Sequence, residues 1–255
     1  MRVLVLGGTA EARALAARLH GDVEVISSLA GRVPDPALPV GAVRIGGFGG
    51  VAGLRKWLVD NRMDAVVDAT HPFAAGITAN AAAACAELGM PHLLLARPGW
   101  ALDGGATPVA SDIAAAGVVA EKGCRRVFLT TGRSGTAAFR GSDAWFLIRA
   151  VTPPDPRLLP PNCELLLSRG PYSYDREREL LSDHRIDVLV TKNSGGSMTR
   201  AKIDAATDLG IDVVVITRPE IPEGVAVVRT AGDAAAWVAA RNAGGETLPV
   251  SMGAG

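Results

Sequence analysis

The chain has 255 residues, 48% of them hydrophobic, and its 26 basic side chains (Lys and Arg) balance 26 acidic ones. This length suits two domains of modest size, and zero net charge argues against nonspecific nucleic-acid binding. No apolar run reaches the roughly 18 residues of a membrane span, and the three cysteines lack the spacing of a metal site. We therefore expect a cytoplasmic protein that uses neither a membrane nor a bound metal.

Short β-branched runs alternate with alanine-rich segments, a pattern that predicts parallel sheets covered by helices. In the first half, strands are expected at residues 2–6, 23–27, 43–45, 65–69 and 93–96, and helices near 10–19, 54–61 and 77–88. In the second half, strands are expected at 126–130, 145–148, 164–167, 187–190 and 212–217, and helices near 113–122, 174–184, 199–209 and 231–241. The expected fold class is α/β, with two Rossmann-like domains at residues 1–100 and 106–243, a cleft between them and a tail at 244–255.

The two halves of the chain also resemble each other. Residues 61–67 (NRMDAVV) match residues 184–190 (HRIDVLV), and residues 88–98 match residues 209–219, both of which end in Arg-Pro. Two interpretations remain open: an internal duplication, or the general likeness of any two strand–helix–strand units.

A glycine turn joins the first predicted strand to the first predicted helix. Its sequence, GGTAEA, matches the dinucleotide-binding pattern G-x-G-x-x-G/A at Gly7 and Ala12, whereas Thr9 replaces the middle glycine. The helix that follows offers unpaired N–H groups to a diphosphate. We therefore predict cofactor binding by Gly7, Gly8, Thr9, Ala10 and Glu11.

The end of the second predicted strand distinguishes the two nicotinamide cofactors. NAD-dependent enzymes place Asp or Glu at this position to bind the ribose 2′-hydroxyl. This chain has Ser27 and Ser28 instead, followed by Arg32. Hydroxyls and a guanidinium suit a 2′-phosphate, so NADPH is the predicted cofactor. The alternative is a plain strand end with a surface arginine.

Basic residues also follow many of the predicted strands. Because ligands of open α/β sheets bind beyond the carboxyl ends of the strands, these cations suit a ligand with several carboxylates or phosphates. The alternative is a general bias of this chain toward arginine. The six cations are Arg97, Arg133, Arg149, Arg169, Lys192 and Arg218, of which all but Arg149 are predicted to bind substrate.

Two further strand-to-helix turns carry polar groups. The first predicts cofactor contacts by Thr70 and by His71, which is also a candidate proton donor. The second is glycine-rich and suits an anion or a carboxamide; its predicted cofactor contacts are Lys192, Asn193, Ser194 and Gly195. Tyr172, on a short loop, is the second catalytic candidate.

Five segments of the chain together resemble the precorrin-6A reductase family of cobalamin biosynthesis: LGGTAE at 6–11, SSLAGR at 27–32, IGGFGG at 45–50, DATHPFA at 68–74 and TKNSGG at 191–196. The resemblance covers the chain to about Val228, although Ala12 stands where family members have glycine. It implies that NADPH reduces one double bond of a tetrapyrrole, converting precorrin-6A to precorrin-6B, and that the cations bind the acetate and propionate groups of the macrocycle. The alternatives are a cobalt-precorrin-6A reductase of the anaerobic pathway and a nonenzymatic NADP-binding sensor. The sequence does not indicate an oligomeric state.

Overall fold

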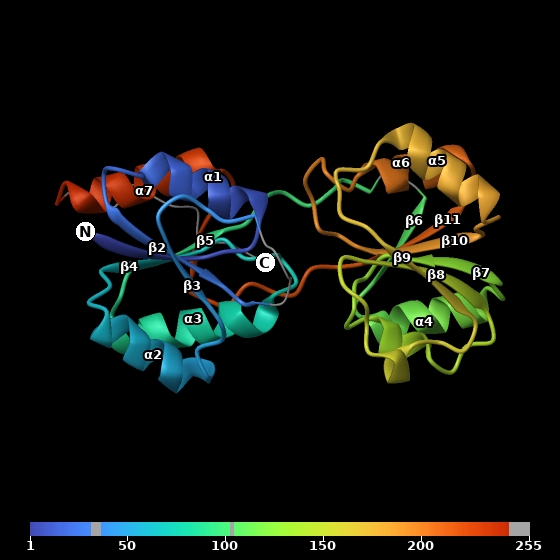
Figure 1. The fold of residues 1–255 in the computed structure, drawn as a ribbon, viewed down its shortest axis with the longest axis horizontal. Coiled ribbons are helices and arrows are strands. Elements are labelled where there is room, and N and C mark those ends of the chain that lie inside the picture. The colour runs from blue at the N-terminus through green and yellow to red at the C-terminus, as the bar shows by residue number, and fades with distance from the viewer. Residues whose placement is uncertain (32–36, 103–104, 245–255) are drawn as a thin grey trace. The chain divides into compact units, whose positions relative to one another are not determined.

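The computed structural model describes residues 1–31, 37–102 and 105–244 (Figure 1). The chain divides into two compact units: Met1–Pro98 together with the chain from Pro219 onward, and Gly99–Arg218. Each unit contains a six-stranded sheet in which all the paired strands are parallel. The predicted α/β class with two parallel-sheet domains is therefore confirmed.

The sheet of the first unit has the strand order β12-β5-β4-β1-β2-β3. Its strands are β1 (Arg2–Leu6), β2 (Glu24–Leu29), β3 (Ala42–Ile45), β4 (Ala65–Asp68), β5 (His92–Leu95) and β12 (Ala226–Val228). Helices α1 (Ala10–Leu19) and α7 (Ala231–Asn242) cover one face, and α2 (Gly50–Asp60) and α3 (Ala75–Leu88) cover the other (Figure 1).

The sequence of β1 explains why this sheet needs helices on both faces. Successive side chains of a strand point to opposite faces. Val3 and Val5 pack with α1 and α7, whereas Leu4 and Leu6 pack with α2 and α3. All four side chains are almost completely buried, as expected for a continuous apolar run in the middle of a parallel sheet.

The sheet of the second unit has the strand order β6-β11-β10-β7-β8-β9. Its strands are β6 (Ala106–Val109), β7 (Arg126–Leu129), β8 (Trp145–Ala150), β9 (Cys163–Leu167), β10 (Val188–Lys192) and β11 (Asp212–Ile216). Helices α5 (Tyr174–Asp183) and α6 (Ala201–Asp208) lie on one face and α4 (Asp112–Glu121) on the other (Figure 1). Two short 3₁₀ segments are η1 (Thr136–Phe139) and η2 (Pro156–Leu158).

The two sheets share one strand order if β1 to β5 are matched with β7 to β11. In this match β12 is the counterpart of β6. β5 of the first sheet is followed in the chain by β6, an edge strand of the second sheet, and β11 of the second sheet is followed by β12, an edge strand of the first. The chain passes between the units at Pro98–Gly99 and again at Arg218–Pro219, which are the ends of the two similar segments in the sequence. This arrangement agrees with an internal duplication.

The predicted second domain, 106–243, was wrong in its last part, because β12 and α7 belong to the first unit. β12 pairs with β5, and Trp237 and Val238 of α7 are buried in the core beside α1. Strands β6 and β12 were not predicted at all. Both are edge strands of four and three residues, and Pro108 interrupts the apolar pattern of β6. Of the expected tail, only Gly244 lies within the described residues.

The three cysteines are free thiols, and burial raises the pKa of the Cys85 thiol to about 12. Within the described residues, no helix is both long and apolar enough to cross a membrane. In the same part of the chain, no group of three or more His, Cys, Asp or Glu side chains is arranged to hold a metal ion.

Candidate functional site

The turn after β1 has the geometry of a phosphate-binding turn. The Gly7 N–H donates to the Ser28 carbonyl oxygen (2.9 Å), and a Cβ on Gly7 would lie 3.4 Å from the Ala12 Cβ. Gly8 has a φ of 108°, a conformation that favours glycine. Thr9 caps α1 by accepting the Ala12 N–H (3.1 Å). Ala10 and Glu11 then begin the helix, whose first N–H groups have no partner within the helix.

A second turn, after β4, is tied to the first. The Thr9 hydroxyl donates to the Ala69 carbonyl oxygen (2.7 Å). Asp68 is fully buried and accepts both the N–H and the hydroxyl of Thr70 (2.9 and 2.6 Å). His71 is exposed, and its Nδ1 accepts the Phe73 N–H (3.2 Å), so Nδ1 is an acceptor in the neutral ring. Thr70 and His71 therefore follow a turn that is fixed beside the predicted diphosphate site.

Glu11 and Arg97 form an ion pair of 2.8 Å next to this turn. A carboxylate in the first turn of α1 interacts favourably with the helix dipole, but it would repel a bound diphosphate. Arg97, two residues after the end of β5, neutralises that charge. The pair places Arg97 at the predicted cofactor site, although the sequence assigned it to substrate.

The three residues predicted to contact the ribose, Ser27, Ser28 and Arg32, have different surroundings in the structure or lie outside its described part. The Ser27 hydroxyl is buried and has no hydrogen-bond partner among the described residues. Alternation along β2 places its side chain on the face that α1 covers, which does not support its predicted contact with a cofactor. Ser28 points to the opposite face and accepts a hydrogen bond from Arg44 Nη1 (2.9 Å). Arg32 lies outside the described residues.

Arg44 is a residue that the sequence reasoning missed. It lies in β3, opposite Ser28 in the parallel ladder, and its Cζ is 3.8 Å from the centroid of the Phe48 ring. The available signal was its position one residue before the end of a predicted strand in the first half. The ligands of α/β sheets bind beyond the strand ends, so a basic residue within a strand does not by itself predict a binding site.

The cations of the second unit fall into two groups. Lys192 donates to the Thr131 carbonyl oxygen (2.9 Å) and lies 3.8 Å from Asp112. Arg218 donates to two carbonyl oxygens of the turn after β10, those of Asn193 (2.9 Å) and Ser194 (3.1 Å). By contrast, Arg133 and Arg169 have exposed side chains.

Arg149 was wrongly counted among the cations of the strand ends. It is buried and makes two hydrogen bonds of 2.8 Å to buried Glu177. Its guanidinium lies 4.0 Å from the centroid of the Tyr172 ring. The Tyr172 hydroxyl in turn donates to the Ser168 carbonyl oxygen (3.1 Å). The Tyr172 side chain therefore holds its own loop on the buried ion pair, which does not support its predicted catalytic role.

The glycine-rich turn after β10 holds the segment that enters the second unit. Asn193 Oδ1 accepts the Trp100 N–H (2.8 Å), and its Nδ2 donates to the Trp100 carbonyl oxygen (3.3 Å). The Trp100 indole N–H donates to the Gly196 carbonyl oxygen (2.7 Å). Two left-handed glycines, Gly195 and Gly196, allow this turn. The Asn193 amide is therefore occupied within the protein, which does not support its predicted cofactor contact.

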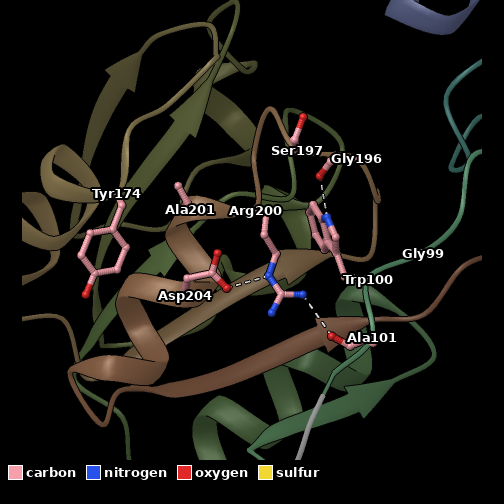
Figure 2. Close-up of a pocket in the computed structure, with 9 residues that line it drawn as sticks. All are labelled: Gly99, Trp100, Ala101, Tyr174, Gly196, Ser197, Arg200, Ala201 and Asp204. Carbon is pink, nitrogen blue, oxygen red and sulfur yellow. Dashed lines mark hydrogen bonds and ion pairs between the residues drawn. The ribbon is translucent and has the colours of Figure 1, made fainter.

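Figure 2 shows an open depression of about 530 Å³ beside this turn. Trp100 and Tyr174 line it, together with the start of α6. Arg200 crosses the depression between Asp204 (2.7 Å) and the Ala101 carbonyl oxygen (3.0 Å). The two charged side chains of the depression, Arg200 and Asp204, are therefore paired with each other.

Lys202 lies deeper in the same unit. Burial lowers the pKa of its ammonium to about 7; Glu177 opposes this shift and Arg149 adds to it. The ammonium donates to the Thr199 carbonyl oxygen (2.8 Å) and lies 5.2 Å from the centroid of the Trp100 ring.

Fold and site together define a two-unit α/β protein whose first unit carries a strand, a glycine turn and a helix in the order that is typical of dinucleotide-binding folds. Residues 2–239 match the family described as Precorrin-6x reductase CbiJ/CobK, and the chain belongs to this family.

Individual relatives agree with this assignment. A precorrin-6A reductase of Mycobacterium tuberculosis is 67% identical over 239 residues, which cover 93% of this chain and 97% of the relative. A solved structure, "CobK precorrin-6A reductase", matches with a TM-score of 0.86 and 38% identity, covering 94% of this chain and 96% of the other. A cobalt-precorrin-6A reductase of Priestia megaterium is 30% identical, covering 87% of this chain and 92% of the relative.

Proposed function

We propose that this chain is a reductase of cobalamin biosynthesis that uses NADPH to reduce one double bond of precorrin-6A, giving precorrin-6B. The observation that carries the proposal is the fixed pair of turns after β1 and β4, at the carboxyl ends of two adjacent parallel strands. Membership of the precorrin-6x reductase family assigns the chemistry. The nonenzymatic sensor is set aside, since the family consists of reductases.

The residues of the first unit fit a dinucleotide. A Cβ on Gly7 would already be in contact with α1. Apart from the chain neighbours of Gly8, no atom of the described residues lies within 4 Å of the position that a Gly8 Cβ would take. The backbone can therefore approach a diphosphate closely. Ser28 and Arg32, at and after the end of β2, would face the ribose, and Thr70 and His71 would face the nicotinamide end. When bound, reduced nicotinamide supplies the hydride.

The protein contributes mainly position and charge to this reaction. The Thr9–Ala69 hydrogen bond holds the two turns together, so groups bound to them keep a fixed separation, which is how orientation lowers a barrier. Arg97 offsets the Glu11 carboxylate beside the diphosphate. We assign His71 to holding the cofactor, because the basic macrocycle can take its proton from water.

The substrate is a tetrapyrrole with acetate and propionate side chains. The exposed Arg133 and Arg169, with Lys192 and Arg218 at the ends of β10 and β11, would bind these carboxylates. Among the comparisons, the precorrin-6A reductase shares 67% of its residues with this chain and the cobalt-precorrin-6A reductase 30%. This difference favours a metal-free substrate.

Incubation of the protein with NADPH and precorrin-6A tests the proposal. We expect the absorbance of reduced nicotinamide to fall only when the tetrapyrrole is present, with one NADPH consumed per macrocycle. Faster turnover of the cobalt-containing substrate would instead support the anaerobic-pathway enzyme. If NADPH is consumed neither with precorrin-6A nor with the cobalt-containing substrate, both reductase assignments are contradicted.

A further inference from the structure

Arg44 is a half-buried cation that the protein holds in one position. Its Nη1 donates to Ser28 Oγ (2.9 Å) and to the Gly46 carbonyl oxygen (3.0 Å), and its Nη2 donates to the Gly47 carbonyl oxygen (3.0 Å). The Phe48 ring packs against the guanidinium at 3.8 Å. These contacts fix the plane of the guanidinium before any ligand arrives.

No carboxylate lies within 4 Å of the Arg44 guanidinium among the residues that the structure describes. Three other arginines of the same unit each have one: Arg2 pairs with Glu24, Arg55 with Glu87 and Arg97 with Glu11. A partly desolvated charge without a counter-charge is unfavourable. The hydrogen-bond partners of Arg44 among the described residues are all neutral oxygens, so an anion brought by a ligand would complete its surroundings.

The donors of Arg44 are sufficient for such an anion. A guanidinium has five N–H groups, and three are used by Ser28 and the two glycine carbonyls. One Nη2 hydrogen and the Nε hydrogen have no acceptor among the described residues. Planar pairs of guanidinium donors match phosphate oxygens well, and a rigid guanidinium loses little further entropy on binding.

The position of Arg44 indicates which anion this is. Ser28 lies at the end of β2, and its carbonyl oxygen accepts the N–H of Gly7 in the diphosphate turn (2.9 Å). In dinucleotide-binding folds this strand end meets the adenosine ribose. The Ser28 hydroxyl and the Arg44 guanidinium are joined across neighbouring strands, so a cation stands where NAD-dependent enzymes place an acid.

We propose that Arg44, held by Ser28 and Phe48, binds the 2′-phosphate of the adenosine ribose and is the main determinant of NADPH preference over NADH. The inference rests on the proposed function, because it assumes that the first unit binds a nicotinamide dinucleotide. It assigns the selectivity for NADPH to Arg44 of β3, in addition to the predicted contact of Arg32.

The test compares ligands that differ only in the 2′-phosphate. Binding of NADPH, NADH, 2′,5′-ADP and 5′-ADP is measured by calorimetry for the wild type, Arg44→Ala and Arg44→Lys. We expect Arg44→Ala to weaken NADPH and 2′,5′-ADP roughly 10- to 100-fold, as for a charge-assisted hydrogen bond, and to change NADH and 5′-ADP less than about twofold. Arg44→Lys keeps the charge but not the planar donors, so an intermediate loss is expected.

Arg55→Ala is the matched control, because Arg55 is exposed on α2 and already paired with Glu87; it should leave all four affinities unchanged. Retained NADH and 5′-ADP binding shows that a variant is folded. If Arg44→Ala fails to fold, Arg44→Lys and Ser28→Ala provide the same comparison.

Two failures are distinguishable. A wild type that binds neither dinucleotide would contradict the proposed function itself. A wild type that prefers NADPH, with the preference unchanged in Arg44→Ala and Arg44→Lys, would overturn the role of Arg44 and leave the reductase proposal intact. Loss of the preference in Arg32→Ala alone would transfer the role to Arg32.

Discussion

The buried ammonium of Lys202 makes the stability of this protein depend on pH in a defined window. Burial lowers the pKa of this ammonium from 10.5 to about 7, against the attraction of Glu177. Below pH 7, both the folded and the unfolded chain carry the proton, and the cost of burying the charge is fully present. Between about pH 7 and 10.5 the unfolded chain binds more protons, so the free energy of unfolding rises with pH.

The size of this rise follows from the difference between the two pKa values. Each pH unit within the window contributes about 1.4 kcal/mol per proton, so the full rise is on the order of 4 to 5 kcal/mol. Arg149 and Glu177 are the other charged groups that influence Lys202, and they pair with each other at 2.8 Å. We therefore expect this pair to remain when Lys202 is replaced.

Urea unfolding of the wild type and Lys202→Met, measured at several pH values from about 6 to 10, tests this reasoning. As pH rises, the free energy of unfolding of the wild type should increase relative to that of Lys202→Met, because only the wild type loses a buried charge. Lys56→Met is the control, since Lys56 is 76% exposed and paired with Asp60. Parallel pH profiles for the wild type and Lys202→Met would refute the shifted pKa.

Three further predictions concern packing, folding and catalysis. Gly135→Ala should destabilise the second unit by about 1–3 kcal/mol in urea unfolding, because the new Cβ would lie 2.1 Å from Thr131 Oγ1. Residues 99–218, expressed alone, should unfold cooperatively by circular dichroism, since they contain a complete six-stranded sheet. His71→Asn should lower kcat by less than about 100-fold and keep the alkaline limb of the pH profile, where a proton donor would lose activity, since a positioning role needs no titrating proton.

Each of these predictions has a control or an outcome that contradicts it. Gly117→Ala lies in α4, and beyond the backbone of α4 itself no atom of the described residues lies within 4 Å of the new Cβ. It should be neutral or stabilising, so equal losses for both variants would disprove the steric argument. A fragment of residues 1–98 should not fold, because it lacks β12 and α7; a stable fragment would contradict the role of α7. A larger loss of kcat in His71→Asn, at unchanged cofactor affinity, would make His71 the proton donor.

The sequence by itself determined the local features of this protein. Apolar runs and alanine-rich segments indicated ten of the strands and the seven α-helices, because the side-chain period and the helix ends depend on neighbouring residues. The turn of Gly7, Gly8 and Thr9 was recognised for the same reason. Its glycine conformation and the Thr9 helix cap are both contained within a few residues.

The tertiary structure alone decided which distant groups meet. Strand pairing placed Arg44 beside Ser28, and the packing of α5 on its sheet gave Arg149 a buried partner in Glu177. The same nonlocal pairing returned β12 to the first sheet. A strand end in the sequence shows that a cation is near the edge of a sheet. Whether its side chain faces a ligand, a carboxylate or the core depends on the neighbouring strands and helices, whose contacts the local pattern does not encode.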